Sequence, residues 1–374
     1  MHKTECKNRE VFLALLRAGF WEKEVRLSQF KDIDFGEVLK LAEGQSVVGL
    51  IAAGLEHVVD IKVPKKDVLA FIGLTMQLEQ RNMAMNYFIA EMVEEMCKMN
   101  ITTVLAKGQG IAQCYERPLW RTCGDVDFFL DSKNYEKAKT YLKPLAKEVE
   151  EEDTFKSHLA LIIKQWVVEL HGSMKSRMWS KLELAMDSLY YDIFKKSKVR
   201  HWQNGSTDVL LPGVDEDAFY IFAHFVCHFF KGGIGLRQIC DWCRLLWVYQ
   251  GKIDKGLLEK RLLSAGLMSE WKVFASFAVE YLAMPVEAMP LYAANNKWKL
   301  KASRVMEFIW ETGNFGHNRD NSRYQKHSYV VYKAISFWRN NSDTIRHFLI
   351  FPKDATLMWR SRLKESVRYL VRGK

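Results

Sequence analysis

The chain has 374 residues, which is too long for one compact core and suits two or three lobes of ordinary size. Hydrophobic residues make up 48% and charged residues 27%, a composition that excludes a largely disordered chain. Lys and Arg outnumber Asp and Glu by 55 to 45. The formal net charge of +10 therefore favours anionic partners, without choosing among nucleotides, nucleic acids and membrane surfaces.

The longest apolar stretches, such as 218–230, fall short of the roughly 20 residues that a membrane span needs, so no span is expected. Residues 1–10 carry charges of both signs, and no apolar h-region of a signal peptide follows them. This pattern predicts no secretory signal and a cytoplasmic protein. The seven cysteines are scattered and odd in number, as expected for free thiols in a reducing compartment.

Residues 1–100 are expected to form an N-terminal helical region. Asp34 and Glu37 have the spacing of a helix capping box. Pro64 is well placed near the first turn of a long helix, which Asn100 ends.

From residue 101 the pattern changes to that of strands mixed with helices. The β-branched run 101–106 predicts a buried strand, followed by a flexible glycine loop at 107–110 and a short helix at 111–116. A further helix is expected over 135–147, and further strands over 124–130, 158–163, 165–170 and 209–211.

After Pro212-Gly213 the chain returns to helix, with candidates at 218–230, 236–249, 257–265, 270–282, 300–312 and 329–339. The predicted fold class is α+β, with a small mixed-sheet lobe over 101–211. The flanking segments would be the N-terminal helical region 1–100 and a C-terminal helical domain 212–374.

Two acids mark the strand that begins at Gly124. Side chains two residues apart project from the same face of a strand, so Asp125 and Asp127 present their carboxylates at one spot while Val126 and Phe128 face a core. Two adjacent like charges are costly unless a cation lies between them, and hard oxygen ligands select Mg²⁺ or Mn²⁺. An isolated Asp-x-Asp pattern is more often just a solvated strand end.

Two further features favour a site. A glycine-flanked loop beside Lys107, able to approach phosphate oxygens, precedes the acidic strand. Glu169 lies within an apolar strand, where an unpaired carboxylate is costly. It is either a salt-bridged residue of an edge strand or the third carboxylate of a two-metal phosphoryl- or nucleotidyl-transfer site.

One set of residues has a recognisable order, namely Lys107-Gly108, Tyr115, Pro118, Arg121 and Gly124-Asp125-Val126-Asp127. In this set the chain resembles the polymerase-beta-like nucleotidyltransferases, and in particular an uncharacterised bacterial nucleotidyltransferase family. The resemblance is specific over 105–131 and over Glu169-Leu170-His171, fair over 212–245 and loosest over 1–100. The chain departs from the family pattern at Gln109, where a small residue is usual, and at Glu169, where Asp is usual.

The resemblance implies adenylyl or other nucleotidyl transfer, in which an acceptor oxygen attacks the α-phosphate of ATP or another nucleoside triphosphate and pyrophosphate leaves. It implies metal ligation by Asp125, Asp127 and Glu169, with Glu169 also helping to deprotonate the acceptor. It also implies a phosphate-binding group that consists of Lys107, Gly108, Gly110, Arg121 and Gly124. Arg121 could equally be a surface arginine. The acceptor, a small molecule or an RNA, and the oligomeric state stay open.

The helix expected at 218–230 is apolar nearly all round, except that His224 and His228 lie together opposite its main stripe. These histidines are either satisfied within the fold or face a substrate cleft. His171, Arg237 and Asp241 are further candidates for that cleft, and the last two could instead form an ion pair. A zinc site of His224 and His228 with Cys227, Cys240 and Cys243 stays open, although a buried thiol often packs as a small hydrophobe.

The segment 359–370 is basic and amphipathic, so it could contact RNA or anionic lipid, or simply pack its apolar side on the core. The predicted function is metal-dependent nucleotidyl transfer. The alternatives are a related scaffold that binds a nucleotide or RNA without turnover, and a helical protein that binds RNA through this basic segment.

Overall fold

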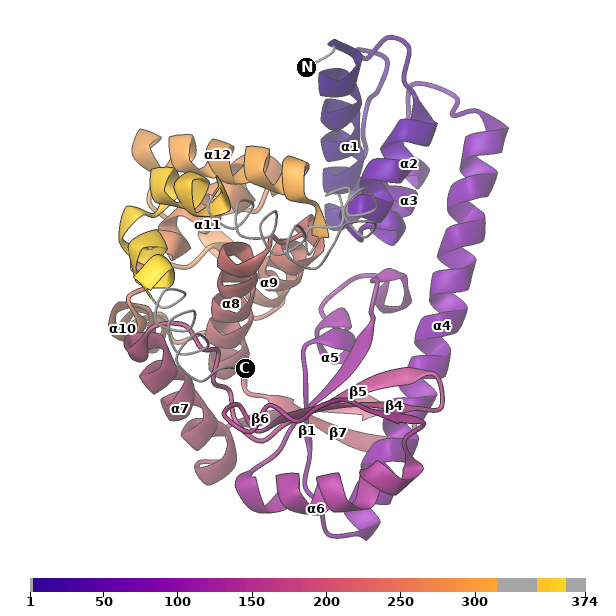
Figure 1. Ribbon diagram of the computed structural model, residues 1–374. Coiled ribbons are helices and arrows are strands. Elements are labelled where there is room, and N and C mark those ends of the chain that lie inside the picture. The colour runs from indigo at the N-terminus through magenta and orange to yellow at the C-terminus, as the bar shows by residue number, and fades with distance from the viewer. Residues whose placement is uncertain (1–2, 315–341, 361–374) are drawn as a thin grey trace, which may run out of the picture.

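The computed structural model describes residues 3–314 and 342–360 and begins with four helices (Figure 1). These are α1 (Lys3–Trp21), α2 (Phe35–Gly44), α3 (Val48–Glu56) and α4 (Lys65–Lys98). Helix α2 begins where predicted, because the side chain of Asp34 accepts a hydrogen bond from the Glu37 N–H at 3.0 Å. The predicted long helix after Pro64 is also confirmed, and α4 runs along one side of the molecule from α2 and α3 to the sheet.

A five-stranded sheet lies next to the lower half of α4 (Figure 1). Its strand order is β1-β2-β5-β4-β3. The strands are β1 (Val104–Ala106), β2 (Asp125–Phe129), β3 (Glu148–Val149), β4 (His158–Ile163) and β5 (Trp166–His171). Strands β2 and β5 are parallel and the other neighbours are antiparallel, so the sheet is mixed, as predicted. The connections include α5 (Gly108–Ala112), η1 (Pro118–Trp120), α6 (Ser132–Leu142) and η2 (Lys143–Leu145).

The elements that were not predicted include β3, α7 (Ser180–Lys195) and β6 (Val199–Asn204). The predicted last strand exists as β7 (Thr207–Pro212), but it pairs with β6 in a separate two-stranded sheet. The turn between them contains Gly205, whose φ of 63° suits a glycine. The side chains of β6 are half-buried or exposed and mostly polar, so this strand gives little hydrophobic signal.

The helical candidates after Pro212 are confirmed up to residue 312. They correspond to α8 (Val214–Lys231), α9 (Leu236–Val248), α10 (Lys255–Ala265), α11 (Met268–Leu282) and α12 (Asn296–Thr312). A short turn, η3 (Val286–Ala288), connects the last two. The helix expected at 329–339 and most of the basic segment 359–370 lie outside the described residues.

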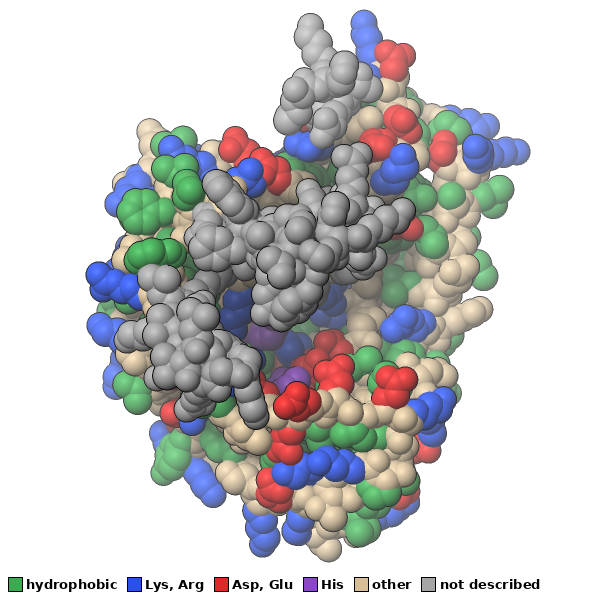
Figure 2. Space-filling view, in the orientation of Figure 1, with side chains coloured by type: hydrophobic (Ala, Val, Ile, Leu, Met, Phe, Trp, Pro, Cys, Tyr) green, Lys and Arg blue, Asp and Glu red, His purple; other side chains and the backbone are tan. Residues whose placement is uncertain are grey.

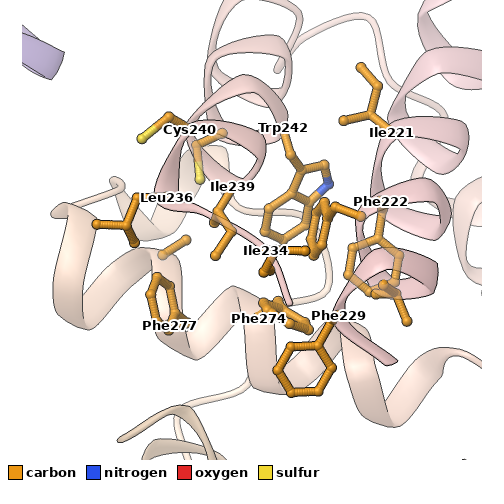
Figure 3. Packing of buried hydrophobic residues seen from close by; sticks show 14 of the residues in the cluster. Ile221, Phe222, Phe229, Ile234, Leu236, Ile239, Cys240, Trp242, Phe274 and Phe277 are labelled. Carbon is orange, nitrogen blue, oxygen red and sulfur yellow. The ribbon is translucent and has the colours of Figure 1, made fainter. Parts of the chain in front are cut away.

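Aromatic side chains hold α8, α9 and α11 together (Figure 3). Phe222 of α8 packs against Trp242 of α9, with ring centroids 5.4 Å apart, and against Phe274 of α11, at 6.2 Å. A second core lies under the sheet, where the C-terminal half of α4 packs against β1, β2, β4, β5 and α6. Among the described helices none could cross a membrane. The division of the chain at residues 100 and 211 stays a prediction.

Candidate active site

The carboxylates of Asp125, Asp127 and Glu169 converge at the centre of the sheet. Strands β2 and β5 are parallel neighbours whose register places Asp127 opposite Glu169. Asp125 lies two residues before Asp127 and therefore on the same face. One oxygen from each of the three carboxylates lies within 4.8 Å of the others. The intervening Val126 and the following Phe128 are buried in the core under the sheet, as the alternation predicted.

Asp127 is the most buried of the three acids, with 1% of its surface exposed. Its Oδ1 lies 2.9 Å from Lys107 Nζ and 2.8 Å from His171 Nε2. Its Oδ2 is buried and has no hydrogen-bond partner among the described residues. A buried, unpaired carboxylate oxygen is unfavourable unless a cation or a donor reaches it.

The charge of Asp127 acts on its neighbours. Repulsion from Asp127, and then burial, raises the pKa of Asp125. Burial alone would lower the pKa of Lys107, but the attraction of Asp127 outweighs it, so the pKa of Lys107 is raised and its ammonium stays charged. Asp127 therefore favours the protonated forms of both Asp125 and Lys107.

The glycine loop has a different shape from the one predicted. Lys107 has a φ of 53°, and a short helix, α5, begins directly after it at Gly108 instead of at residue 111. Gly108 also has a positive φ, and a Cβ there would lie 3.3 Å from Cys123 Sγ. At Gly110 a Cβ would lie only 2.7 Å from Leu211 Cδ2. These two glycines let the loop pack closely on the start of β2 and on β7.

Gln109, the departure from the family pattern, faces away from the acids. Its side chain is buried and donates a hydrogen bond to Asn82 Oδ1 of α4 at 2.8 Å. The Asn82 amide in turn donates to the backbone carbonyls of Leu119 and Arg121. Gln109 therefore ties the loop to α4.

Two histidines surround Glu169. His171 lies two residues after Glu169 on β5, and His158 lies opposite His171 in the β4–β5 pair. Glu169 Oε2 is 3.2 Å from His158 Nε2 and 3.3 Å from His171 Nε2. Burial alone would raise the pKa of Glu169, but hydrogen bonds from both histidines lower it well below its usual range. Burial would lower the pKa of His171, but its bonds to Asp127 and Glu169 raise it.

Arg121 is buried, so the interpretation as a surface arginine is wrong. Its Nε and Nη2 donate to the two carboxylate oxygens of Asp241, both at 2.7 Å, and the Tyr115 hydroxyl donates to the same carboxylate at 2.8 Å. Asp241 lies on α9, so this group fixes the helical half of the molecule to the segment before β2. Arg237 donates instead to the Thr122 carbonyl at 2.9 Å, and the ion pair of Asp241 is with Arg121.

His224 and His228 are half-buried, whereas the residues around them in the middle of α8 are buried. This agrees with their predicted place on the side of the helix opposite its apolar stripe. Their Nε2 atoms lie 3.1 Å apart, and His224 Nε2 is 3.5 Å from Lys107 Nζ. Burial and then the positive charge of Lys107 lower the pKa of His224 well below its usual value and that of His228 to about 4. Both imidazoles are neutral at pH 7.

The zinc hypothesis does not fit the structure. Cys227, Cys240 and Cys243 are buried free thiols in the helical core, and burial raises the pKa of each. Among the described residues, the groups with metal-ligand spacing are formed by Asp125, Asp127 and Glu169 and by His158, Glu169 and His171. The three cysteines therefore pack as small hydrophobic side chains.

The acids open into a cavity of about 500 Å³. All predicted site residues except Gly110 line it, together with Arg81, which the sequence did not single out. Figure 2 shows the hollow, with basic and histidine side chains inside it and acidic side chains along its lower rim. Four Lys or Arg side chains and four carboxylates line the cavity, so a bound divalent cation would make it suitable for a polyanion.

A smaller cavity of about 190 Å³ adjoins the first. Both cavities are lined by Glu169, His171, His224 and His228. The smaller one also contains His158 and three lysines, Lys156, Lys175 and Lys231. Sequence reasoning missed His158: pairing the predicted strands 158–163 and 165–170 about a turn at Lys164 would place it opposite Leu170, whereas the structure pairs it with His171.

The comparisons with known proteins identify the family. A family model described as "Uncharacterised nucleotidyltransferase" matches residues 31–283, about two thirds of the chain. The match spans α2 to α11 and includes every candidate site residue. No curated protein and no solved structure matches the chain significantly. The matched segment includes the glycine loop and the strands that carry Asp125, Asp127 and Glu169. The chain therefore belongs to this uncharacterised nucleotidyltransferase family.

Proposed function

We propose that the protein is a metal-dependent nucleotidyltransferase that moves a nucleoside monophosphate group from a nucleoside triphosphate to an acceptor hydroxyl or phosphate. The observation that carries the proposal is the convergence of Asp125, Asp127 and Glu169 within 4.8 Å of one another at the wall of a 500 Å³ cavity. Three oxygen donors beside cationic side chains suit a divalent ion that binds phosphates.

The residues present fit Mg²⁺ or Mn²⁺. All three donors are carboxylates, the ligand type that these hard cations prefer, and the buried Oδ2 of Asp127 lacks a partner among the described residues. Asp125, Asp127 and Glu169 would hold the ion. When bound, the ion supplies positive charge to the phosphate oxygens.

Three cationic side chains have distinct roles in the proposal. Lys107 lies 2.9 Å from Asp127 and lines the same cavity, where its ammonium can contact a phosphate oxygen. Arg237 and Arg81 hold the turn before β2 through the carbonyls of Thr122 and Gly124, at 2.9 and 3.5 Å, and line the same cavity.

Arg121 acts as a positioning residue instead of a direct phosphate ligand. Two of its donors are occupied by the Asp241 carboxylate, and a third contacts the Thr122 carbonyl. The pair fixes the segment that leads into Asp125 against α9. This placement limits movement between the acids and the wall of the cavity formed by α8 and α9.

The adjoining cavity provides the place for the acceptor. An acceptor oxygen must approach the α-phosphate from the side opposite the leaving pyrophosphate, and the smaller cavity meets the larger one at Glu169 and His171. Glu169, which lines both cavities, lies where it can accept the proton of the acceptor. The lysines of this cavity favour an acceptor that carries a negative charge.

The test uses Asp125→Ala and Asp127→Ala, with Asp187→Ala as the matched control, because Asp187 is exposed on α7. Binding of each of the four common nucleoside triphosphates is measured by calorimetry with and without Mg²⁺. Transfer is measured with label in the α-phosphate. We expect the two site variants to bind the preferred nucleotide at least about 100-fold more weakly, a loss of about 3 kcal/mol, with unchanged circular dichroism.

Asp187→Ala should bind the nucleotide like the wild type. Metal-dependent nucleotide binding that survives unchanged in both site variants would overturn the proposal. Wild-type binding without transfer to any small-molecule or RNA pool would instead favour a scaffold that binds a nucleotide without turnover.

A further inference from the structure

A second set of potential metal ligands lies on the acceptor side of Glu169. It consists of His158, Glu169 and His171, whose ligand atoms all lie within 4.8 Å of one another. The sheet itself creates the set, because His158 and His171 are directly opposed in the β4–β5 pair and Glu169 shares a face with His171. His158 Nε2 and His171 Nε2 both lie near the same oxygen, Glu169 Oε2, at 3.2 and 3.3 Å, and His171 Nε2 also lies 2.8 Å from Asp127 Oδ1.

The two distances from the Glu169 oxygen to the imidazole nitrogens suit a single ion. Two ligands that are each about 2.1 Å from one metal can be no more than about 4.2 Å apart. The distances from Glu169 Oε2 to the two imidazole nitrogens, 3.2 and 3.3 Å, fall within this limit. Two imidazoles with one carboxylate form a ligand set that suits transition metals, whereas Mg²⁺ prefers oxygen ligands only.

The set is also accessible. All three residues line the 190 Å³ cavity, so an ion can enter and can keep coordination positions open toward a molecule bound there. Glu169 belongs to both groups, because its carboxylate also lies within 4.8 Å of oxygens of Asp125 and Asp127. One carboxylate shared by two sites is an arrangement that places two ions about 3.5–4 Å apart in two-metal enzymes.

We propose that His158, Glu169 and His171 form a second divalent-metal site, which takes a transition metal such as Mn²⁺ or Zn²⁺ in preference to Mg²⁺ and faces the acceptor cavity. The role of this second site rests on the proposed function, because Glu169 links the site to the one that binds the nucleotide. The protein would therefore hold two unlike ions, one with oxygen ligands only and one with histidine ligands.

The test is Mn²⁺ binding to chelator-treated full-length protein in the presence of millimolar Mg²⁺, which fills the oxygen-only site. Electron paramagnetic resonance counts the bound Mn²⁺, and its pulsed form detects nitrogen nuclei bonded to the ion. We expect one tightly bound Mn²⁺ per chain with ¹⁴N couplings. Labelling the wild-type chain with ¹⁵N-histidine should change these couplings, a result that requires no substitution.

His158→Gln and His171→Gln should each weaken Mn²⁺ binding by at least about 10-fold and remove part of the nitrogen signal. His201→Gln is the matched control, because His201 is exposed on β6 and pairs with Asp208 at 2.8 Å. Circular dichroism confirms that each variant is folded. A bound Mn²⁺ without nitrogen couplings, or unchanged affinity in His158→Gln, would overturn the site.

The same samples separate this inference from the proposed function. Mg²⁺-dependent nucleotide binding together with a Mn²⁺ that lacks nitrogen ligands refutes only the histidine site. A Mn²⁺ with nitrogen ligands in a protein that binds no nucleotide supports the histidine site and refutes the proposed function.

Discussion

Replacing Asp241 by leucine should be one of the most destabilising single changes near the candidate active site. Asp241 accepts two hydrogen bonds from the Arg121 guanidinium and one from the Tyr115 hydroxyl. The side chains of the Arg121–Asp241 pair are only 4% and 9% exposed. Asp241→Leu leaves the Arg121 charge buried without a counterion, which costs about 3–5 kcal/mol of unfolding free energy.

The double variant Arg121→Met with Asp241→Leu removes both charges and leaves only the Tyr115 hydroxyl without its acceptor. We expect it to lose only about 1–3 kcal/mol, the cost of one unsatisfied buried hydroxyl. The two substitutions should therefore couple by at least about 2 kcal/mol in a double-mutant cycle. Urea unfolding followed by tryptophan fluorescence measures the unfolding free energy of each variant.

A loss below about 1 kcal/mol in Asp241→Leu, or strictly additive losses in the cycle, would refute the reasoning. Nucleotide binding by the double variant gives a second result. Since Arg121 is proposed to position the segment before Asp125, its replacement should weaken binding less than Asp127→Ala does. If the two changes weaken nucleotide binding equally, Arg121 contacts the phosphates itself.

Two further predictions concern stability. Gly110→Ala should lower the unfolding free energy by about 1–3 kcal/mol, because its Cβ would lie 2.7 Å from Leu211 Cδ2. Gly124→Ala is the control and should change the unfolding free energy little, because no atom lies near its Cβ. Equal melting temperatures of the two variants would contradict this prediction. The pKa of His228, lowered from 6.5 to about 4, makes the unfolded chain bind this proton first as the pH falls. The neutral His228 therefore contributes at most about 3 kcal/mol to the unfolding free energy. This contribution should be complete above pH 6.5 and lost by about pH 4. His228→Gln should flatten this part of the pH profile of urea unfolding, and an unchanged slope would argue against it.

The acids could be predicted from the sequence because their placement depends on local rules. The period of two along a strand puts Asp125 and Asp127 on one face, and the apolar Val126 and Phe128 show which face is the core. The predicted strand 165–170 likewise contained Glu169. Local rules also located α4, whose start follows Pro64.

The partners of these residues could not be predicted, because they depend on contacts between segments far apart in the chain. Arg121 and Asp241 are 120 residues apart, and nothing in either segment indicates the other. The direction of the Gln109 side chain depends on Asn82 of α4, which lies among residues with an ordinary helical pattern. His158 could have been identified only from the register of the β4–β5 hairpin. The sequence indicated this hairpin but did not determine its register.

Helix α4 limits how the part of the chain that contains the candidate active site can be produced as a separate fragment. The core under the sheet includes Met85, Phe88, Ile89, Met92 and Met96 of this helix. A fragment that starts at residue 101 would leave the apolar underside of the sheet open to water, and it would also lose Asn82, which holds both Gln109 and the carbonyl of Arg121. A fragment that keeps the acids in place therefore has to include α4 from Asn82 onward.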